Sequence, residues 1–163
     1  FMEIERKFLI DWNQITNMGL PLVKQANSRQ GYLSAAVPVV RIRERVFSDG
    51  HTDYILCIKG KGRLARQEIE KELSEQEFHD LEELLPIPMI QKDYRVYRLS
   101  DGHLLECSLV DQKFAYAEVE FSSVEEANAF VMPEFLLKDV TEDPYYSMAG
   151  YWKRKQITVS FEL

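Results

Sequence analysis

Charged and apolar residues alternate along much of this chain, beginning in the segment MEIERKFLI at residues 2–10. Glu3, Glu5 and Lys7 occupy every second position there, with Ile4 and Phe8 among the residues of the other set. Side chains of an extended strand point alternately to its two faces, so the three charges share one face. That face lies either on the solvent-exposed surface or along a polar, water-filled interior, and the other segments of the sequence are needed to choose between these alternatives.

The same alternation predicts further strands, joined by tight turns. The turn sequences SDGH at 48–51 and SDG at 100–102 predict hairpins. Closing such a sheet into a barrel removes its exposed edges, and a barrel of about eight strands has room for side chains or one small ligand. We therefore expect an α+β, mainly β fold: an eight-stranded antiparallel β-barrel with a few flanking helices. The expected strands cover residues 2–10, 24–34, 38–47, 52–60, 63–73, 89–98, 103–110 and 115–121.

Two capping boxes predict two of the helices. Ser74 is followed three residues later by Glu77, which predicts a helix over 75–84, and Ser123 with Glu126 predicts one that ends near residue 130. A short helix is expected after Pro144. No repeat, low-complexity tract or linker interrupts the sequence, so residues 1–163 are expected to form a single domain.

Composition narrows the class of protein. The net charge of −7 argues against nonspecific nucleic-acid binding, which normally needs a basic excess. No apolar stretch approaches the ~20 residues that span a bilayer, and early charges interrupt any signal peptide. Cys57 and Cys107 lie in apolar, strand-like segments and are predicted to be reduced core residues, neither a disulfide nor a metal site. We expect a cytoplasmic protein without a membrane or nucleic-acid partner.

Several strands carry acids and cations on one face. Arg41, Arg43 and Arg45 share a face of one strand, and Glu118 shares a face with Glu120 on another. Charges inside a barrel are tolerated only when they are paired or coordinate a ligand. Arginine binds phosphate oxygens in a bidentate manner, and carboxylates bind Mg²⁺ or Mn²⁺. A charged interior could therefore hold a polyanion with a metal ion, although an apolar interior with charges outside stays open on composition alone.

Six motifs, taken in order, resemble those of the CYTH superfamily, the triphosphate tunnel metalloenzymes, over nearly the whole chain. The resemblance implies an eight-stranded antiparallel barrel whose tunnel holds a triphosphate, with Mg²⁺ or Mn²⁺ as the cofactor. The motifs are EIERK at 3–7, VRIRER at 40–45, IKGKGRLARQEIEKEL at 58–73, KDYRVY at 92–97, AEVEF at 117–121 and KDVTEDPYYSMA at 138–149.

The resemblance also implies a role for each matched residue. Glu118 and Glu120 match the principal metal ligands, while Glu3 and Glu5 match acids that bind metal or position the attacking water. Lys7 matches a basic residue that contacts phosphate at the catalytic centre. The implied phosphate-binding set is Lys7, Arg41, Arg43, Lys59, Arg66, Lys92, Arg95 and Lys138, supported by Glu68, Glu70 and Glu106.

Three positions test this resemblance. Lys92 and Arg95 are three residues apart, so an ideal strand would direct them to opposite faces, and both reach the tunnel only with a bulge or strand end between them. Ser108 stands two residues after Glu106, where the family usually has Asp, which puts that strand's share of the metal site in doubt. Tyr116 is expected to serve packing.

The implied function is metal-dependent hydrolysis of a triphosphate, above all inorganic tripolyphosphate. Three alternatives stay open on the same scaffold: a class IV-type adenylate cyclase that converts ATP to cyclic AMP and pyrophosphate, a thiamine triphosphatase, and a non-catalytic polyphosphate-binding module. Both pairs of acids, Glu3 with Glu5 and Glu118 with Glu120, are present, which favours an enzyme. No clear set of residues that would recognise adenine is found, so the cyclase ranks second. The partner is a small-molecule triphosphate, and a homodimer stays open.

Overall fold

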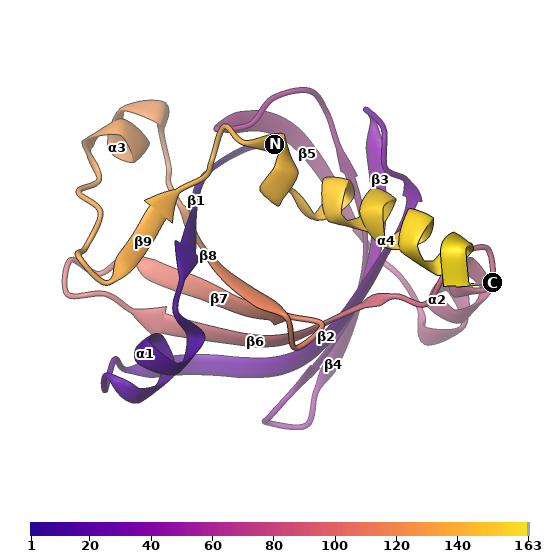
Figure 1. Cartoon of the computed structure of the whole chain (residues 1–163), viewed down its shortest axis with the longest axis horizontal. Coiled ribbons are helices and arrows are strands. Elements are labelled where there is room, and N and C mark those ends of the chain that lie inside the picture. The colour runs from indigo at the N-terminus through magenta and orange to yellow at the C-terminus, as the bar shows by residue number, and fades with distance from the viewer. Residues whose placement is uncertain (163) are drawn as a thin grey trace.

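The computed structural model describes residues 1–162, and in it eight strands close into an antiparallel barrel (Figure 1). Around the barrel the order is β1, β5, β4, β3, β2, β6, β7 and β8, and β8 pairs again with β1. The predicted closed barrel is confirmed. The strands are β1 (Met2–Ile10), β2 (Leu22–Ser34), β3 (Val39–Phe47), β4 (Thr52–Lys59), β5 (Ala65–Glu72), β6 (Ile90–Arg98), β7 (Leu104–Val110) and β8 (Phe114–Glu120).

Both helices predicted from capping boxes form. In α2 (Glu75–Glu82), the Ser74 hydroxyl accepts from the backbone N–H of Glu77 at 3.0 Å, and the Glu77 carboxylate accepts from the N–H of Ser74 at 2.9 Å. In α3 (Val124–Ala129), only half of the box is present. The Ser123 hydroxyl accepts from the N–H of Glu126 at 3.0 Å, whereas the Glu126 carboxylate turns to the N–H of Ser122 at 3.1 Å.

Four elements differ from the sequence-based expectation. Helix α1 (Trp12–Asn17) and strand β9 (Leu136–Asp139) were not predicted, and both are short. The short helix expected after Pro144 is a 3₁₀ turn, η1 (Pro144–Tyr146), followed by the 15-residue helix α4 (Met148–Glu162). The β-branched residues near the end of α4 disfavour a helix on propensity alone. Tertiary packing decides instead, because Trp152 of α4 is only 1% exposed against the barrel.

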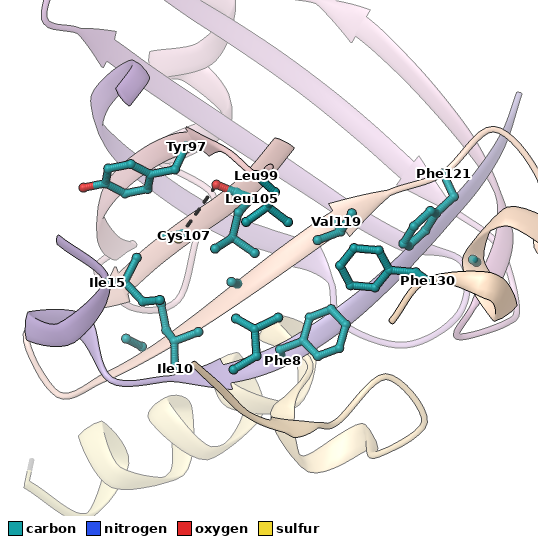
Figure 2. Close-up of a cluster of buried hydrophobic side chains, with 14 residues drawn as sticks. Phe8, Ile10, Ile15, Tyr97, Leu99, Leu105, Cys107, Val119, Phe121 and Phe130 are labelled. Atoms are coloured by element: carbon teal, nitrogen blue, oxygen red, sulfur yellow. Dashed lines mark hydrogen bonds between the residues drawn. The ribbon is translucent and has the colours of Figure 1, made fainter. Parts of the chain in front are cut away.

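The main apolar core lies outside the barrel wall. Outward-facing residues of β1, β7 and β8 pack against α1, α3 and the loop after α3, with Phe8, Val119, Phe121 and Phe130 in contact (Figure 2). Helix α4 lies across one end of the barrel (Figure 1) and forms a second cluster there through Trp152. Since helices cover the apolar faces, the inner face of the wall is free to carry charge.

Two sequence predictions about cysteine and membrane association bear on this fold. Cys57 and Cys107 are both free and fully buried, as predicted. Within residues 1–162, no helix combines the length and the apolar character that a bilayer crossing requires.

A histidine clamp joins the β6–β7 turn to α3, and we expect it to make stability depend on pH. His103 lies 2.8 Å from carboxylate oxygens of both Asp101 and Glu126, and these bonds, that to Asp101 first, raise the pKa of His103. Stability from the charged clamp is therefore fully present below the unfolded-state pKa of ~6.5 and is lost as pH rises through the higher folded-state pKa.

The measurement is urea unfolding of the wild type and of His103→Gln at pH 6 and pH 9. We expect the free energy of unfolding of the wild type to exceed that of the variant by ~0.5–1 kcal/mol at pH 6, and by less at pH 9. A difference between the two proteins that does not change with pH contradicts the clamp.

Candidate active site in the barrel interior

The barrel encloses a cavity of about 710 Å³ whose walls are charged. All eight barrel strands contribute inward-facing side chains, and the loop 60–63 and the start of α4 line its mouth. Ten lining side chains are cationic and seven are acidic. The alternative of an apolar interior is thus excluded. The lining includes these sequence-predicted residues: Glu3, Glu5, Lys7, Arg41, Arg43, Lys59, Arg66, Glu68, Glu70, Lys92, Glu106, Glu118 and Glu120.

Two implied phosphate-binding residues lie elsewhere. Arg95 is bound to Asp93 at 3.0 and 3.1 Å, and its guanidinium lies 5.1 Å from the ring centre of Trp12. Strand β6 pairs with β7 without a bulge between Lys92 and Arg95, so their spacing places them on opposite faces. Lys138 lies on the added strand β9, outside the closed ring, and is exposed. The structure therefore corrects the sequence-based placement of both residues.

Arg41 and Arg43 are the most unusual cations of the cavity. Among residues 1–162, their Nε atoms are the buried side-chain nitrogens and oxygens that have no hydrogen-bond partner. Burial, followed by repulsion from Arg41 and Arg45, lowers the pKa of Arg43 to about 10, which leaves the group charged at neutral pH. Buried donors without acceptors are costly, so this wall is suited to receive an anion.

A tyrosine lies between two lysines on the opposite part of the wall. Lys92 Nζ donates to the Tyr116 hydroxyl at 2.5 Å, and Lys7 Nζ lies 4.4 Å from the centre of the Tyr116 ring. Burial lowers the pKa of Lys92 well below its usual value. Tyr116 packs in the buried cluster around Trp152, as expected, and it also lines the cavity. Its position two residues before Glu118 on β8 is the sequence signal that could have revealed this.

Three acids gather where β1 and β8 meet. Glu3, Glu5 and Glu120 each offer a carboxylate oxygen, and these oxygens all lie within 4.8 Å of one another. Burial, with repulsion from Glu106 and Glu3 among the neighbouring acids, raises the pKa of Glu120 to about 7. Burial also raises the pKa of Glu5 well above its ordinary value. The cluster is an all-oxygen donor set of three closely spaced carboxylates, which fits a hard divalent cation such as Mg²⁺ or Mn²⁺.

Glu118 has different neighbours from Glu120, although the two were expected to act as one pair. It lies opposite Lys7 in the β1–β8 register. Burial alone raises the pKa of Glu118, but the ammonium of Lys7, a hydrogen bond from Glu5 and the charge of Lys92 bring it below the ordinary value. Glu118 is therefore an ionised partner of the lysines at the edge of the acid cluster.

An ion-pair network supports the acid cluster. Lys59 Nζ lies 3.0 and 3.1 Å from the two carboxylate oxygens of Glu3 and 3.4 Å from Glu68, and Arg66 Nε lies 3.4 Å from Glu3. Glu68, expected to support the phosphate-binding residues, thus contacts Lys59. The ion pairs hold Glu3 in place between strands β1, β4 and β5.

Strand β7 contributes Glu106 and Ser108 to the cavity. The Tyr94 hydroxyl donates to Glu106 at 2.6 Å, which fixes that carboxylate. Asp111, the nearest acid further along, accepts from the Tyr151 hydroxyl at 2.7 Å and from Lys155 at 3.1 Å. Asp111 thus anchors α4, and no carboxylate on β7 replaces the family's usual Asp at Ser108.

Comparisons with known proteins agree with this fold. No family model matches the chain. An inorganic triphosphatase from Nitrosomonas europaea is 32% identical over 148 residues, which cover 88% of this chain and 92% of the relative. The solved structure of the inorganic triphosphatase NE1496 has a TM-score of 0.61 and 28% identity over 91% of this chain and 93% of that one. The PH1819 protein of Pyrococcus horikoshii OT3 shares the fold, with a TM-score of 0.69 and 17% identity over 96% and 99% of the two chains.

The chain belongs to the CYTH superfamily of triphosphate tunnel enzymes, as its ordered motifs implied. Membership of this family implies a divalent cation, and the cluster of Glu3, Glu5 and Glu120 supplies ligands of the right chemistry for one.

Proposed function

We propose that this protein hydrolyses inorganic tripolyphosphate inside its barrel with the help of Mg²⁺ or Mn²⁺. The unpartnered Nε atoms of Arg41 and Arg43 carry the proposal, because they face a cavity in which cations outnumber acids. A polyanion supplies the missing acceptors and the missing negative charge. The similarity to an inorganic triphosphatase supports the same substrate.

Phosphoryl transfer depends mainly on placement and charge neutralisation, and the lining offers both. Arg41 and Arg43 bind phosphate oxygens, and Lys59 of the neighbouring strand β4 and Lys92 of β6 line the same cavity. Glu118 keeps Lys7 charged and oriented toward the substrate. The two arginines thereby set the position of the phosphate chain along the barrel axis.

The acid cluster of Glu3, Glu5 and Glu120 holds the metal in this proposal, with Glu118 at its edge. When bound, Mg²⁺ or Mn²⁺ neutralises charge on the phosphate oxygens and polarises the phosphorus toward attack. Lys59 holds Glu3 through both carboxylate oxygens, so that this ligand is in place before the ion arrives. The outcome is cleavage into pyrophosphate and phosphate.

The lining tyrosines favour an inorganic substrate over a nucleotide. Tyr32 packs on Trp152 with ring centres 5.9 Å apart, and Arg45 lies 5.6 Å from the ring centre of Tyr94. The ring of Tyr116 is approached by lysines, as described above. Each of these rings already has an aromatic or cationic neighbour, which competes with an adenine or a thiamine ring for stacking. The cyclase and the thiamine triphosphatase therefore rank below the hydrolase of tripolyphosphate.

The same proposal places residues 1–163 as one tunnel domain acting in the cytoplasm on a small molecule, without a nucleic-acid or membrane partner. The net charge of −7 and the two free, buried cysteines support this setting.

The direct test measures phosphate release from tripolyphosphate, ATP and thiamine triphosphate with Mg²⁺ and with Mn²⁺, while cyclic AMP is assayed in parallel. We expect tripolyphosphate to be turned over with the highest kcat/KM and no cyclic AMP to form. Cyclic AMP production, or a preference for ATP, overturns the proposal. Tight binding of tripolyphosphate without turnover identifies a binding module instead.

Replacing a cavity arginine should weaken substrate binding, whereas replacing Arg95 should not. A charge-assisted hydrogen bond contributes ~1.5–3 kcal/mol, so Arg43→Ala or Arg41→Ala is expected to raise the Kd for tripolyphosphate by roughly 10- to 150-fold. Arg95→Ala is the matched control, since the same truncation removes a cation from the outer face. Calorimetric titration without divalent metal provides the Kd, and equal losses in all three variants contradict the assignment.

Metal binding should weaken as the solution becomes more acidic. Glu120, with a pKa of about 7, keeps its proton below that pH, and the proton competes with the metal. We expect the Mg²⁺ affinity to fall roughly tenfold from pH 8 to pH 6, with protons released on binding.

Glu120→Gln provides the control for this pH dependence. It should bind Mg²⁺ more weakly at pH 8 and show a smaller change between the two pH values. Calorimetry in two buffers of different ionisation enthalpy measures the proton release. An Mg²⁺ affinity of the wild type that is the same at both pH values excludes Glu120 as a ligand.

A further inference from the structure

Three arginines follow one another at every second position of β3, and all three line the cavity: Arg41, Arg43 and Arg45. With a rise of ~3.4 Å per residue, the Cα atoms of Arg41 and Arg45 lie ~14 Å apart along the strand. This row is longer than three linked phosphate groups. The third arginine is therefore in place for a longer phosphate chain unless another group withholds it.

Arg45 is the last cation of this row and lies level with a lysine of the site. Ser28 of β2 pairs with Arg45 of β3 on one side and with Lys92 of β6 on the other, and all three side chains line the cavity. Phe47 is the next residue of β3 on the same face. It packs in a small apolar cluster with Ala26, Tyr94 and Val96. The charged part of the β3 face thus ends at Arg45.

Asp53 binds the guanidinium of Arg45 with two hydrogen bonds. The two residues are directly opposite in the β3–β4 register. Arg45 donates to the two carboxylate oxygens of Asp53, from Nε at 3.1 Å and from Nη2 at 2.7 Å. The guanidinium also lies 5.0 and 5.6 Å from the ring centres of Phe47 and Tyr94. Arg45 is therefore fixed and neutralised, whereas the Nε atoms of the other two arginines have no partner within residues 1–162.

We propose that Asp53 restricts the site to short phosphate chains, because it withholds Arg45 from the substrate. The inference rests on the proposed function and adds chain length to the description of its substrate. The cavity of about 710 Å³ is larger than three phosphate groups, so volume alone does not exclude a fourth. Charge does so instead. A fourth phosphate that reaches the end of the row meets an ion pair whose carboxylate repels it, and no free guanidinium.

A single substitution is enough to release Arg45. The charge of Glu106 also acts on Arg45, but its carboxylate accepts from the Tyr94 hydroxyl at 2.6 Å. Within residues 1–162, Asp53 is the acid that forms an ion pair with Arg45. Asp53→Asn keeps the shape of the side chain and removes its charge, so that Arg45 can bind a phosphate oxygen.

The test compares the Kd of tripolyphosphate with that of tetrapolyphosphate, by calorimetric titration at pH 8 without divalent metal. In the wild type, the two Kd values should agree within about threefold, because the fourth phosphate gains no cation. In Asp53→Asn, the Kd of tetrapolyphosphate should fall roughly tenfold more than that of tripolyphosphate, which corresponds to about one charge-assisted hydrogen bond. The ratio of the two Kd values removes any general effect of the lost negative charge.

Asp93→Asn is the matched control, since it removes the same charge from a doubly hydrogen-bonded pair, that with Arg95 on the outer face. Its Kd ratio should stay at the wild-type value. Adding Arg45→Met to Asp53→Asn should abolish the gain, because the released guanidinium is then absent.

Four results overturn the inference: no change of the ratio in Asp53→Asn, an equal change in Asp93→Asn, a gain that persists without Arg45, or a wild type that already binds tetrapolyphosphate tenfold more tightly. The last comparison needs no variant, so it decides even where Asp53→Asn fails to fold. Each of these results leaves the proposed function intact if the wild type hydrolyses tripolyphosphate. Absence of that hydrolysis removes the proposed function itself.

Discussion

The ion pair between Lys59 and Glu3 is the interaction on which the site depends. Lys59 comes from β4 and Glu3 from β1, and both side chains are about one-tenth exposed or less. Removing either partner leaves a buried charge with only its longer contact, Glu68 for Lys59 or Arg66 for Glu3, and such a loss costs more than a surface pair contributes. The pair lies next to the short β1–β5 pairing that closes the barrel. Barrel closure and the position of a candidate metal ligand are thus set by the same contact.

The outer face of the barrel wall stabilises the fold, and the inner face forms the candidate site. The outer face of β1, β7 and β8 carries the apolar core under α1 and α3, so the fold does not depend on filling the interior with hydrocarbon. The inner face carries charges of both signs, partly paired with each other. The fold tolerates the unpartnered Nε atoms of Arg41 and Arg43 because the apolar core outside the wall stabilises it. A folded site that is ready for a polyanion follows from this division.

Strand parity made much of this site predictable. Every second residue from Glu3 to Lys7 faces inward, as do Arg41 and Arg43, because a strand has a period of two. The same rule excludes Arg95, which the motif had included. Parity could not predict that Glu120 meets Glu3 and Glu5 while Glu118 turns to Lys7, because cross-strand neighbours depend on register and rotamers. Likewise α4 depends on where Trp152 finds a partner, which local sequence does not reveal.

The enclosure of so many cations changes the outside of the molecule. Half of the chain's 20 lysines and arginines line the main cavity, compared with 7 of its 27 aspartates and glutamates. The remaining surface is therefore strongly anionic, and its long-range field repels free phosphates at low ionic strength. The mouth of the cavity attracts anions locally, because it carries three cations: Lys61, Arg63 and Lys153. Encounter with a polyanion is thereby restricted to one small area, and added salt should ease its approach from every other direction.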